Sequence, residues 1–156
     1  MPDRSIIFVC SGNVCRSPMA EYLLRRQLGA DSGWDVSSAG ISAPSGMSAS
    51  REAVAVLNEL GIDLRPHRSK PVIKEDVEVA SMIVVMTASH YEQIKSLFPE
   101  VAGNVYLMKS FDPEADGNDI SDPIGSSVDI YREIRDEIGA ALPGLIKYMK
   151  TFKEKE

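Results

Sequence analysis

The sequence predicts an α/β protein in which a parallel sheet lies between two layers of helices, and three observations lead to this class. Short apolar runs with the length of buried strands recur at residues 5–10, 35–39, 82–86 and 105–108. Segments with apolar residues at helical spacing separate and follow these runs, which is typical of parallel strands joined by helices. A chain of 156 residues is long enough for one substantial core. We therefore predict a three-layer sandwich that forms a single domain over residues 1–156.

The predicted strands differ in how deeply they should be buried. Residues 5–10 are apolar nearly throughout, as expected for a strand covered by helices on both faces. Residues 35–39 read Asp-Val-Ser-Ser-Ala and are more polar, which predicts a position nearer an edge of the sheet. Residues 82–86, Met-Ile-Val-Val-Met, are the clearest strand of the chain.

Local signals mark the ends of the predicted helices. Ser17 is placed to cap the first helix and Gly29 to end it. Ser89 and Glu92 have the spacing of a capping box for the fourth helix. The five predicted helices span residues 18–28, 50–60, 74–80, 89–98 and 127–150.

The last predicted helix and the loop before it have distinct features. Pro143-Gly144 falls inside the helix, so we expect a kink or a break there. An apolar stripe on this helix should face the core, and it consists of Ile130, Ile134, Ile138, Leu142, Leu145 and Met149. The preceding loop, residues 109–126, is long and polar and contains Asp112, Asp116, Asp119 and Asp122. Loops of this length in compact domains are usually functional or disordered.

Composition excludes several classes of protein. The formal net charge of −6 and the lack of a basic stripe argue against a nucleic-acid partner. No apolar run approaches the roughly 20 residues of a membrane span, and residues 1–4 do not resemble a signal peptide. The chain has only two cysteines, which we interpret as reduced thiols in a reducing compartment. We therefore expect a cytoplasmic protein that contacts neither a membrane nor nucleic acid.

Residues 10–17, Cys-Ser-Gly-Asn-Val-Cys-Arg-Ser, connect the first strand to the first helix and form the most informative segment. A tight loop between a strand and a helix directs backbone N–H groups and a helix N-terminus into one small bowl, which suits an anion. Arg16 adds a planar fork of donors for a phosphate. At such positions the pKa of a thiol falls from about 8.5 to roughly 3.5–7.5, so Cys10 is placed as a nucleophile. Gly12 is expected to permit the turn, and Ser17 to hydrogen-bond the sulfur.

The second cysteine of this loop, Cys15, allows two interpretations. A reversible Cys10–Cys15 disulfide could protect the nucleophile, because a sulfenic acid condenses with a nearby thiol. Alternatively, Cys15 simply packs behind the loop. A metal site is not expected, because His67 and His90 are the only histidines and lie far from the cysteines in the sequence.

The chain resembles the low-molecular-weight protein-tyrosine-phosphatase family over nearly its full length. The residues that carry the resemblance are Phe-Val-Cys-Ser-Gly-Asn-Val-Cys-Arg-Ser-Pro-Met-Ala-Glu at 8–21, Ser38-Ala39-Gly40 and Asp122-Pro123. The first string is highly specific. The resemblance implies a four-stranded parallel sheet of order 2-1-3-4 with helices on both faces.

The resemblance also implies a mechanism, position by position. Cys10 attacks phosphorus, and Arg16 with the loop N–H groups holds the phosphate oxygens. Asn13 braces the loop, Ser17 supports the sulfur, and Asp122 acts as general acid and then as general base. The implied phosphate-binding residues are Ser11, Gly12, Asn13, Val14, Cys15 and Arg16. The implied enzyme uses no metal or organic cofactor and acts as a monomer on a phosphorylated protein or peptide. Without the resemblance, any of the four aspartates of the 109–126 loop could be the acid.

Two substrates remain open. Tyrosine phosphatases of the family usually have two aromatic residues after the Asp-Pro, whereas this chain has Ile124-Gly125. That pattern is similar to the bacterial protein-arginine-phosphatase branch. The arginine phosphatases typically have threonine at the position of Val14, where tyrosine phosphatases have an apolar residue. We favour phosphotyrosine, with phosphoarginine as the alternative.

Two other functions are disfavoured. An arsenate reductase of this fold needs further cysteines downstream, and none follows Cys15. A non-catalytic phosphate-binding module would not require Cys10, Arg16 and a downstream aspartate together.

Overall fold

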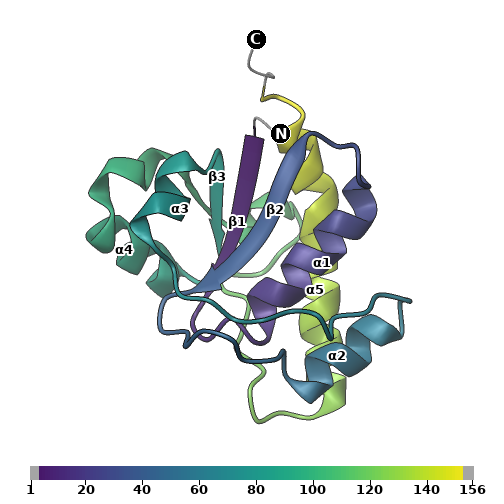
Figure 1. Cartoon of the computed structure of the whole chain (residues 1–156). Helices are drawn as coiled ribbons and strands as arrows, with labels where there is room; N and C mark the ends of the chain where they lie inside the picture. Colours follow the sequence, from purple (N-terminus) through teal and green to yellow (C-terminus); the bar gives the residue numbers. More distant parts are fainter. Residues whose placement is uncertain (1–3, 153–156) are drawn as a thin grey trace.

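A computed structural model describes residues 4–152, which form a four-stranded parallel sheet with helices on both faces (Figure 1). The strand order is β2-β1-β3-β4, so the predicted fold class and order are confirmed, as is the edge position of the second strand. The strands are β1 (Arg4–Cys10), β2 (Trp34–Gly40), β3 (Met82–Val85) and β4 (Val105–Leu107). Each pairs with its neighbour in parallel.

Five α-helices and two short 3₁₀ helices connect and follow the strands. The α-helices are α1 (Arg16–Leu28), α2 (Arg51–Asn58), α3 (Lys74–Val79), α4 (Ala88–Leu97) and α5 (Val128–Met149). The 3₁₀ helices are η1 (Pro99–Asn104) and η2 (Met108–Phe111). None of the helices in the described part of the chain combines the length and the apolar character needed to span a membrane.

The sheet separates two hydrophobic cores, because successive side chains of a strand point to opposite faces. On β1, Ile6 and Phe8 belong to the core beneath α1 and α5, whereas Ile7 and Val9 belong to the core beneath α3 and α4. All four are essentially inaccessible to solvent. The continuous apolar sequence of β1 is therefore explained by burial on both faces, and Figure 1 shows the helices that cover the two faces of the sheet.

The predicted helix caps are wrong at two positions. The first helix begins at Arg16 after Cys15, with no side-chain cap, so Ser17 lies inside the helix and uses its hydroxyl elsewhere. The cap of α4 is Thr87, whose hydroxyl accepts a hydrogen bond from the His90 N–H at 3.1 Å. The Ser89–Glu92 pair therefore lies within α4. Thr87, two residues before Ser89, takes the capping position, which suits threonine as well as serine.

The last helix is unbroken, contrary to the kink or break expected at Pro143-Gly144. Gly144 serves a different purpose, since a Cβ atom there would overlap the carbonyl oxygen of Phe111 in η2. The predicted stripe of α5 is buried except for Ile130, which is 39% exposed near the start of the helix.

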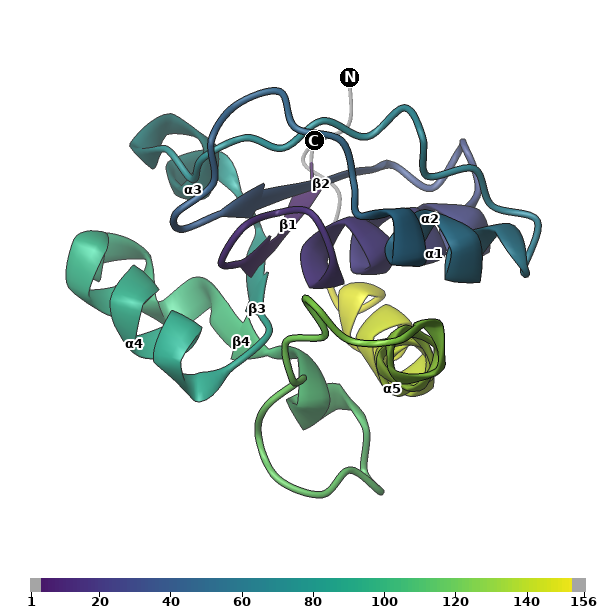
Figure 2. The ribbon, with the colours of Figure 1, turned by 90° about the horizontal axis from the view of Figure 1, so that it is seen from below.

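The carboxyl ends of the strands meet at one edge of the sheet, which Figure 2 shows from below. The connection after β1 leads to β2 on one side of the sheet, whereas the connection after β3 leads to β4 on the other side, so the strand order reverses between the adjacent strands β1 and β3. Ligands of open parallel sheets bind at this kind of switch point. The Cys10–Ser17 loop leaves β1 here, and the segment that leads into α5 reaches the same place.

Candidate active site

The Cys10–Ser17 loop directs carbonyl groups outward, where they accept hydrogen bonds from residues outside the loop. The carbonyl oxygens and their donors are Cys10 with Ile41 N–H, Ser11 with Ser42 N–H, Asn13 with His67 Nε2–H, Val14 with Ser50 N–H, and Cys15 with Met19 N–H, at 2.7–3.2 Å. The C=O and the following N–H of a trans peptide point in opposite directions. We infer that the N–H groups of Ser11, Gly12, Val14, Cys15 and Arg16 face the interior of the loop.

Asn13 braces the loop from its centre. Its φ of 56° is the only positive φ among the described non-glycine residues, so the left-handed turn expected of Gly12 is made one residue later. The Asn13 amide donates to Ser17 Oγ at 2.8 Å and to Ser38 Oγ at 3.0 Å, and its Oδ1 accepts from the Lys70 N–H at 3.0 Å. The Asn13 side chain can make four hydrogen bonds. Three of them are made to other protein groups, and all three hold the turn in place.

The Cys10 sulfur lies at the base of the loop and is 2% exposed. Its Sγ accepts a hydrogen bond from the Asn13 N–H at 3.3 Å and lies 2.9 Å from Ser17 Oγ. The Asn13 N–H therefore serves the sulfur, unlike the N–H groups that face the interior of the loop. Hydrogen bonds to a thiolate favour the charged form.

Arg16 is buried beside Cys10 with donors still available. Its Nη1 donates to the Ile120 carbonyl at 2.9 Å, and its Nη2 lies 3.7 Å from Asp122 Oδ2. Its Nε is buried and has no hydrogen-bond partner among residues 4–152. A buried donor without a partner is costly, and an anion in the bowl would satisfy it.

The structure distinguishes Asp122 from the other aspartates of the 109–126 loop. Asp122 lines the cavity above Cys10, and its side chain is about half exposed. Asp119 instead accepts the Ala88 N–H at the start of α4 at 2.8 Å. Asp112 and Asp116 line a separate hollow in which most residues are acidic. Among these four aspartates, Asp122 is the one that lines the cavity over Cys10.

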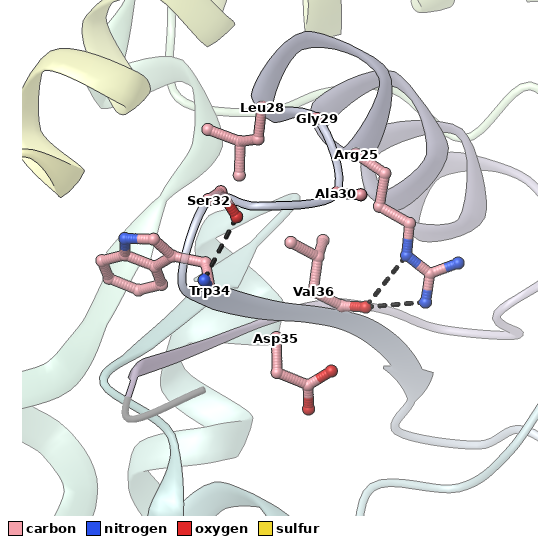
Figure 3. A pocket seen from close by; sticks show the side chains of 8 residues that line it. All are labelled: Arg25, Leu28, Gly29, Ala30, Ser32, Trp34, Asp35 and Val36. Carbon is pink, nitrogen blue, oxygen red and sulfur yellow. Dashed lines mark hydrogen bonds between the residues drawn. The ribbon is translucent and has the colours of Figure 1, made fainter. Parts of the chain in front are cut away.

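The cavity over Cys10 is small, with a volume of about 30 Å³, and its lining consists of Cys10, Gly12, Asn13, Val14, Cys15, Arg16, Asp122 and Ile124. Two larger hollows lie elsewhere. One of about 370 Å³ surrounds Trp34 at the opposite end of β2 (Figure 3), and another of about 480 Å³ is lined mostly by carboxylates. Neither contains Cys10 or Arg16. A phosphoryl group is small, so a shallow bowl lined by donors fits it better than a larger hollow without them.

Both histidines contact the loop through hydrogen bonds between residues far apart in the sequence, 54 positions for His67 and 79 positions for His90. His67 holds the Asn13 carbonyl, and His90 Nε2 lies 2.9 Å from Ser11 Oγ. Burial and the nearby Arg16 guanidinium lower the pKa of His90 to about 4. Within residues 4–152, no three side chains of the usual ligand types cluster so that they could hold a metal ion.

The rear of the loop contacts helix α5. Tyr131 of α5 is buried, and its hydroxyl lies 3.2 Å from Cys15 Sγ. Burial raises the pKa of both the Cys15 thiol and the Tyr131 phenol. Ser38 and Glu21 were also missed as members of the site. The feature that could have pointed to Ser38 is a polar residue near the carboxyl end of β2, the strand next to β1. The feature that could have pointed to Glu21 is an acidic residue on the buried face of α1.

The fold and this site are those of a cysteine-dependent phosphatase, and comparison with known proteins identifies the family. The profile described as low molecular weight phosphotyrosine protein phosphatase matches residues 5–155. A protein-arginine-phosphatase of Geobacillus stearothermophilus is 41% identical over 97% of this chain and 99% of its own length. A low molecular weight protein-tyrosine-phosphatase of Acinetobacter johnsonii is 36% identical over 79% of this chain and 82% of its own length.

Solved structures agree with the sequence comparison. The structure of an arginine phosphatase from Geobacillus stearothermophilus superimposes with a TM-score of 0.86 at 38% identity, covering 95% of this chain and 94% of the other. The chain therefore belongs to the low molecular weight protein-tyrosine-phosphatase family and is a cysteine-dependent protein phosphatase. Membership in this family implies a phosphorylated protein as substrate.

Proposed function

We propose that this protein hydrolyses phosphotyrosine in proteins, with Cys10 as nucleophile, Arg16 as phosphate ligand and Asp122 as general acid and base. The observation that supports the choice of phosphotyrosine is the mouth of the bowl. Its lining includes Val14 and Ile124, two apolar side chains, and Ile124 is 61% exposed. A phenyl ring leaving the bowl would bury apolar surface against them.

In the first step, the Cys10 thiolate attacks phosphorus and the bond from phosphorus to the tyrosine oxygen breaks. Asp122 gives its proton to the departing phenolate, so that tyrosine leaves as a neutral phenol. Arg16 and the inward N–H groups of the loop bind the three equatorial oxygens as their charge redistributes. Asn13 keeps these N–H groups in place through its hydrogen bonds to Ser17, Ser38 and Lys70.

In the second step, water attacks the phosphorus of the cysteinyl-phosphate and the S–P bond breaks. Asp122, now a carboxylate, takes the proton from this water. Ser17 Oγ lies 2.9 Å from the sulfur, where it stabilises the departing thiolate. The products are inorganic phosphate and the enzyme in its starting state.

We also propose that Cys10 and Cys15 form a reversible disulfide, which would protect the Cys10 sulfur against further oxidation.

Phosphoarginine is the second candidate, and two observations favour it. The relative with 41% identity over 97% of this chain is named a protein-arginine-phosphatase. The residues after Asp122-Pro123 are also not the aromatic pair that would hold a phenyl ring. Against it, Val14 and Ile124 provide no acceptor for a guanidinium, which leaves Asp122 as the acceptor at the mouth.

We expect this enzyme to act as a monomer. We also expect it to be cytoplasmic, because a thiolate nucleophile requires a reducing compartment. The net charge of −6 disfavours nucleic acid as a partner.

A paired rate comparison tests the substrate. The reduced enzyme is given a phosphotyrosine peptide and a phosphoarginine peptide of matched sequence, with Cys10→Ser as the blank. We expect kcat/KM to be at least about tenfold higher for phosphotyrosine, and Val14→Thr to reduce that ratio by placing a hydroxyl at the mouth. A preference for phosphoarginine would replace the first substrate by the second. Hydrolysis by Cys10→Ser would refute the mechanism for both.

A further inference from the structure

We infer that Glu21, on the buried face of α1, is a positioning residue that sets the direction of the hydrogen bonds ending at the Cys10 sulfur. This inference rests on the proposed role of Cys10 as a thiolate nucleophile. The chain of contacts starts at Arg25 on the surface and passes through Glu21, Ser38, Asn13 and Ser17 before it reaches Cys10.

The contacts in this chain are one ion pair and four hydrogen bonds. Arg25 Nη2 lies 2.6 Å from Glu21 Oε2, and Ser38 Oγ donates to Glu21 Oε1 at 2.6 Å. The Asn13 amide nitrogen donates to Ser38 Oγ at 3.0 Å and to Ser17 Oγ at 2.8 Å. Ser17 Oγ lies 2.9 Å from Cys10 Sγ. Glu21, Ser38, Asn13, Ser17 and Cys10 are all 6% exposed or less.

The direction of each bond follows from the acceptor at the far end. An ionised carboxylate accepts hydrogen bonds and donates none, so the single proton of Ser38 points to Glu21. Ser38 is then available to Asn13 only as an acceptor, which fixes the Asn13 NH₂ group toward Ser38 and Ser17. The Lys70 N–H, which donates to Asn13 Oδ1, enforces the same amide orientation from the other side.

The last step assigns the proton between Ser17 and Cys10. Ser17 Oγ accepts from the Asn13 amide, so the Ser17 proton must be donated elsewhere. Two side-chain atoms contact Ser17 Oγ, the Asn13 amide nitrogen and the Cys10 sulfur, and of these two the sulfur is the one that can accept the proton. With the Asn13 N–H, the sulfur receives two hydrogen bonds, and both favour the thiolate.

Arg25 keeps the carboxylate in position. Its Nε and Nη2 donate to the Val36 carbonyl of β2 at 3.2 and 2.8 Å, which Figure 3 shows as two dashed lines. The guanidinium is therefore tied to the sheet on one side and to Glu21 on the other. Arg25 is 48% exposed, so solvent reaches only the outer end of the chain.

Glu21→Gln tests the direction of the bonds because it preserves the shape of the side chain. Arg25 only donates, so the single amide oxygen of glutamine turns to Arg25 and its NH₂ group turns to Ser38. The Ser38 proton then points at the Asn13 NH₂ group, so the Asn13–Ser38 hydrogen bond is lost and the amide that donates to Ser17 is held less firmly. The removal of a negative charge would by itself favour the thiolate, so the two effects on Cys10 have opposite signs.

The measurement is the pH dependence of Cys10 alkylation by iodoacetamide, read at Cys10 by fragment mass spectrometry. For Glu21→Gln we expect the pH of half-maximal rate to rise by about one unit, the order of one hydrogen bond to a charged group. Ser38→Ala interrupts the same chain without changing the charge and should raise it in the same direction. The double variant should shift no further than the larger single shift. Glu133→Gln, the same chemical change on an exposed part of α5, should have no effect.

The outcomes separate cleanly. An unchanged or lowered half-point in folded Glu21→Gln, or additive shifts in the double variant, would overturn the inference. If Glu21→Gln does not fold, an unchanged half-point in folded Ser38→Ala overturns it instead. Alkylation needs neither a phosphorylated substrate nor Asp122. An enzyme that hydrolyses neither phosphopeptide would therefore refute the proposed function without deciding this inference.

Discussion

Lowering the pH from 7 to 5 is expected to destabilise the protein by about 2 kcal/mol through His90 alone. His90 is 4% exposed at the start of α4, and its Nδ1 is buried without a hydrogen-bond partner. Burial and, to a smaller extent, the Arg16 guanidinium lower its pKa from 6.5 to about 4, while Asp119 and Asp122 act in the opposite sense. In the native protein the ring therefore stays neutral over a range where a solvated histidine becomes charged.

The sign follows from proton binding. Between pH 6.5 and pH 4 the unfolded chain binds a proton at His90 that the native protein does not, so stability is present above this range and is lost as the pH falls. Between pH 7 and pH 5 the titration of His90 lowers the free energy of unfolding by about 2 kcal/mol, and below pH 4 the total decrease reaches about 3 kcal/mol. This is a substantial part of the roughly 5–15 kcal/mol by which proteins are stable.

Urea unfolding of the wild type and of His90→Gln at the two pH values measures this contribution. Glutamine does not titrate, and it retains an N–H donor for Ser11 Oγ. The wild type should lose about 2 kcal/mol more than the variant on going from pH 7 to pH 5, because the carboxylates of both proteins titrate alike. Parallel losses in the two proteins would show that His90 is solvated or charged in the native state, and the reasoning would fail.

Three further predictions follow from the site. Gly40→Ala should destabilise the fold by about 1–3 kcal/mol in urea unfolding, because the new Cβ would lie 2.6 Å from the Ser11 carbonyl oxygen. Unchanged stability would mean that the loop yields easily. Asp122→Asn should lower kcat for a phosphotyrosine peptide by roughly 10²–10⁴-fold and lower it much less for p-nitrophenyl phosphate, whose leaving group needs no proton. Equal losses on both substrates would assign another role to Asp122. Tyr131→Phe removes the hydroxyl next to Cys15 and should cost about 1 kcal/mol of stability with little change in kcat, and a large loss of kcat would instead indicate that Tyr131 supports the loop during catalysis.

The sequence by itself predicted the sheet and led to the chemistry proposed for the loop. Strand runs of nearly uniform apolar character predict burial on both faces, and this depends only on local composition. The loop is also local, since Cys10 and Arg16 are six residues apart and a strand-to-helix turn brings them together. Local groups at fixed spacing can be placed before any long-range contact is known.

Only the tertiary structure selected Asp122 among the four aspartates of its loop. Asp122 meets Arg16 across 106 positions of the sequence, and His90 meets Ser11 across 79, so which side chains touch depends on how α4 and the segment before α5 pack on the sheet. The same holds for the close approach of Gly144 to Phe111. Glu21 shows the difference most clearly, because an acidic residue on a helix normally lies in solvent, and here packing against β2 turns it toward Ser38.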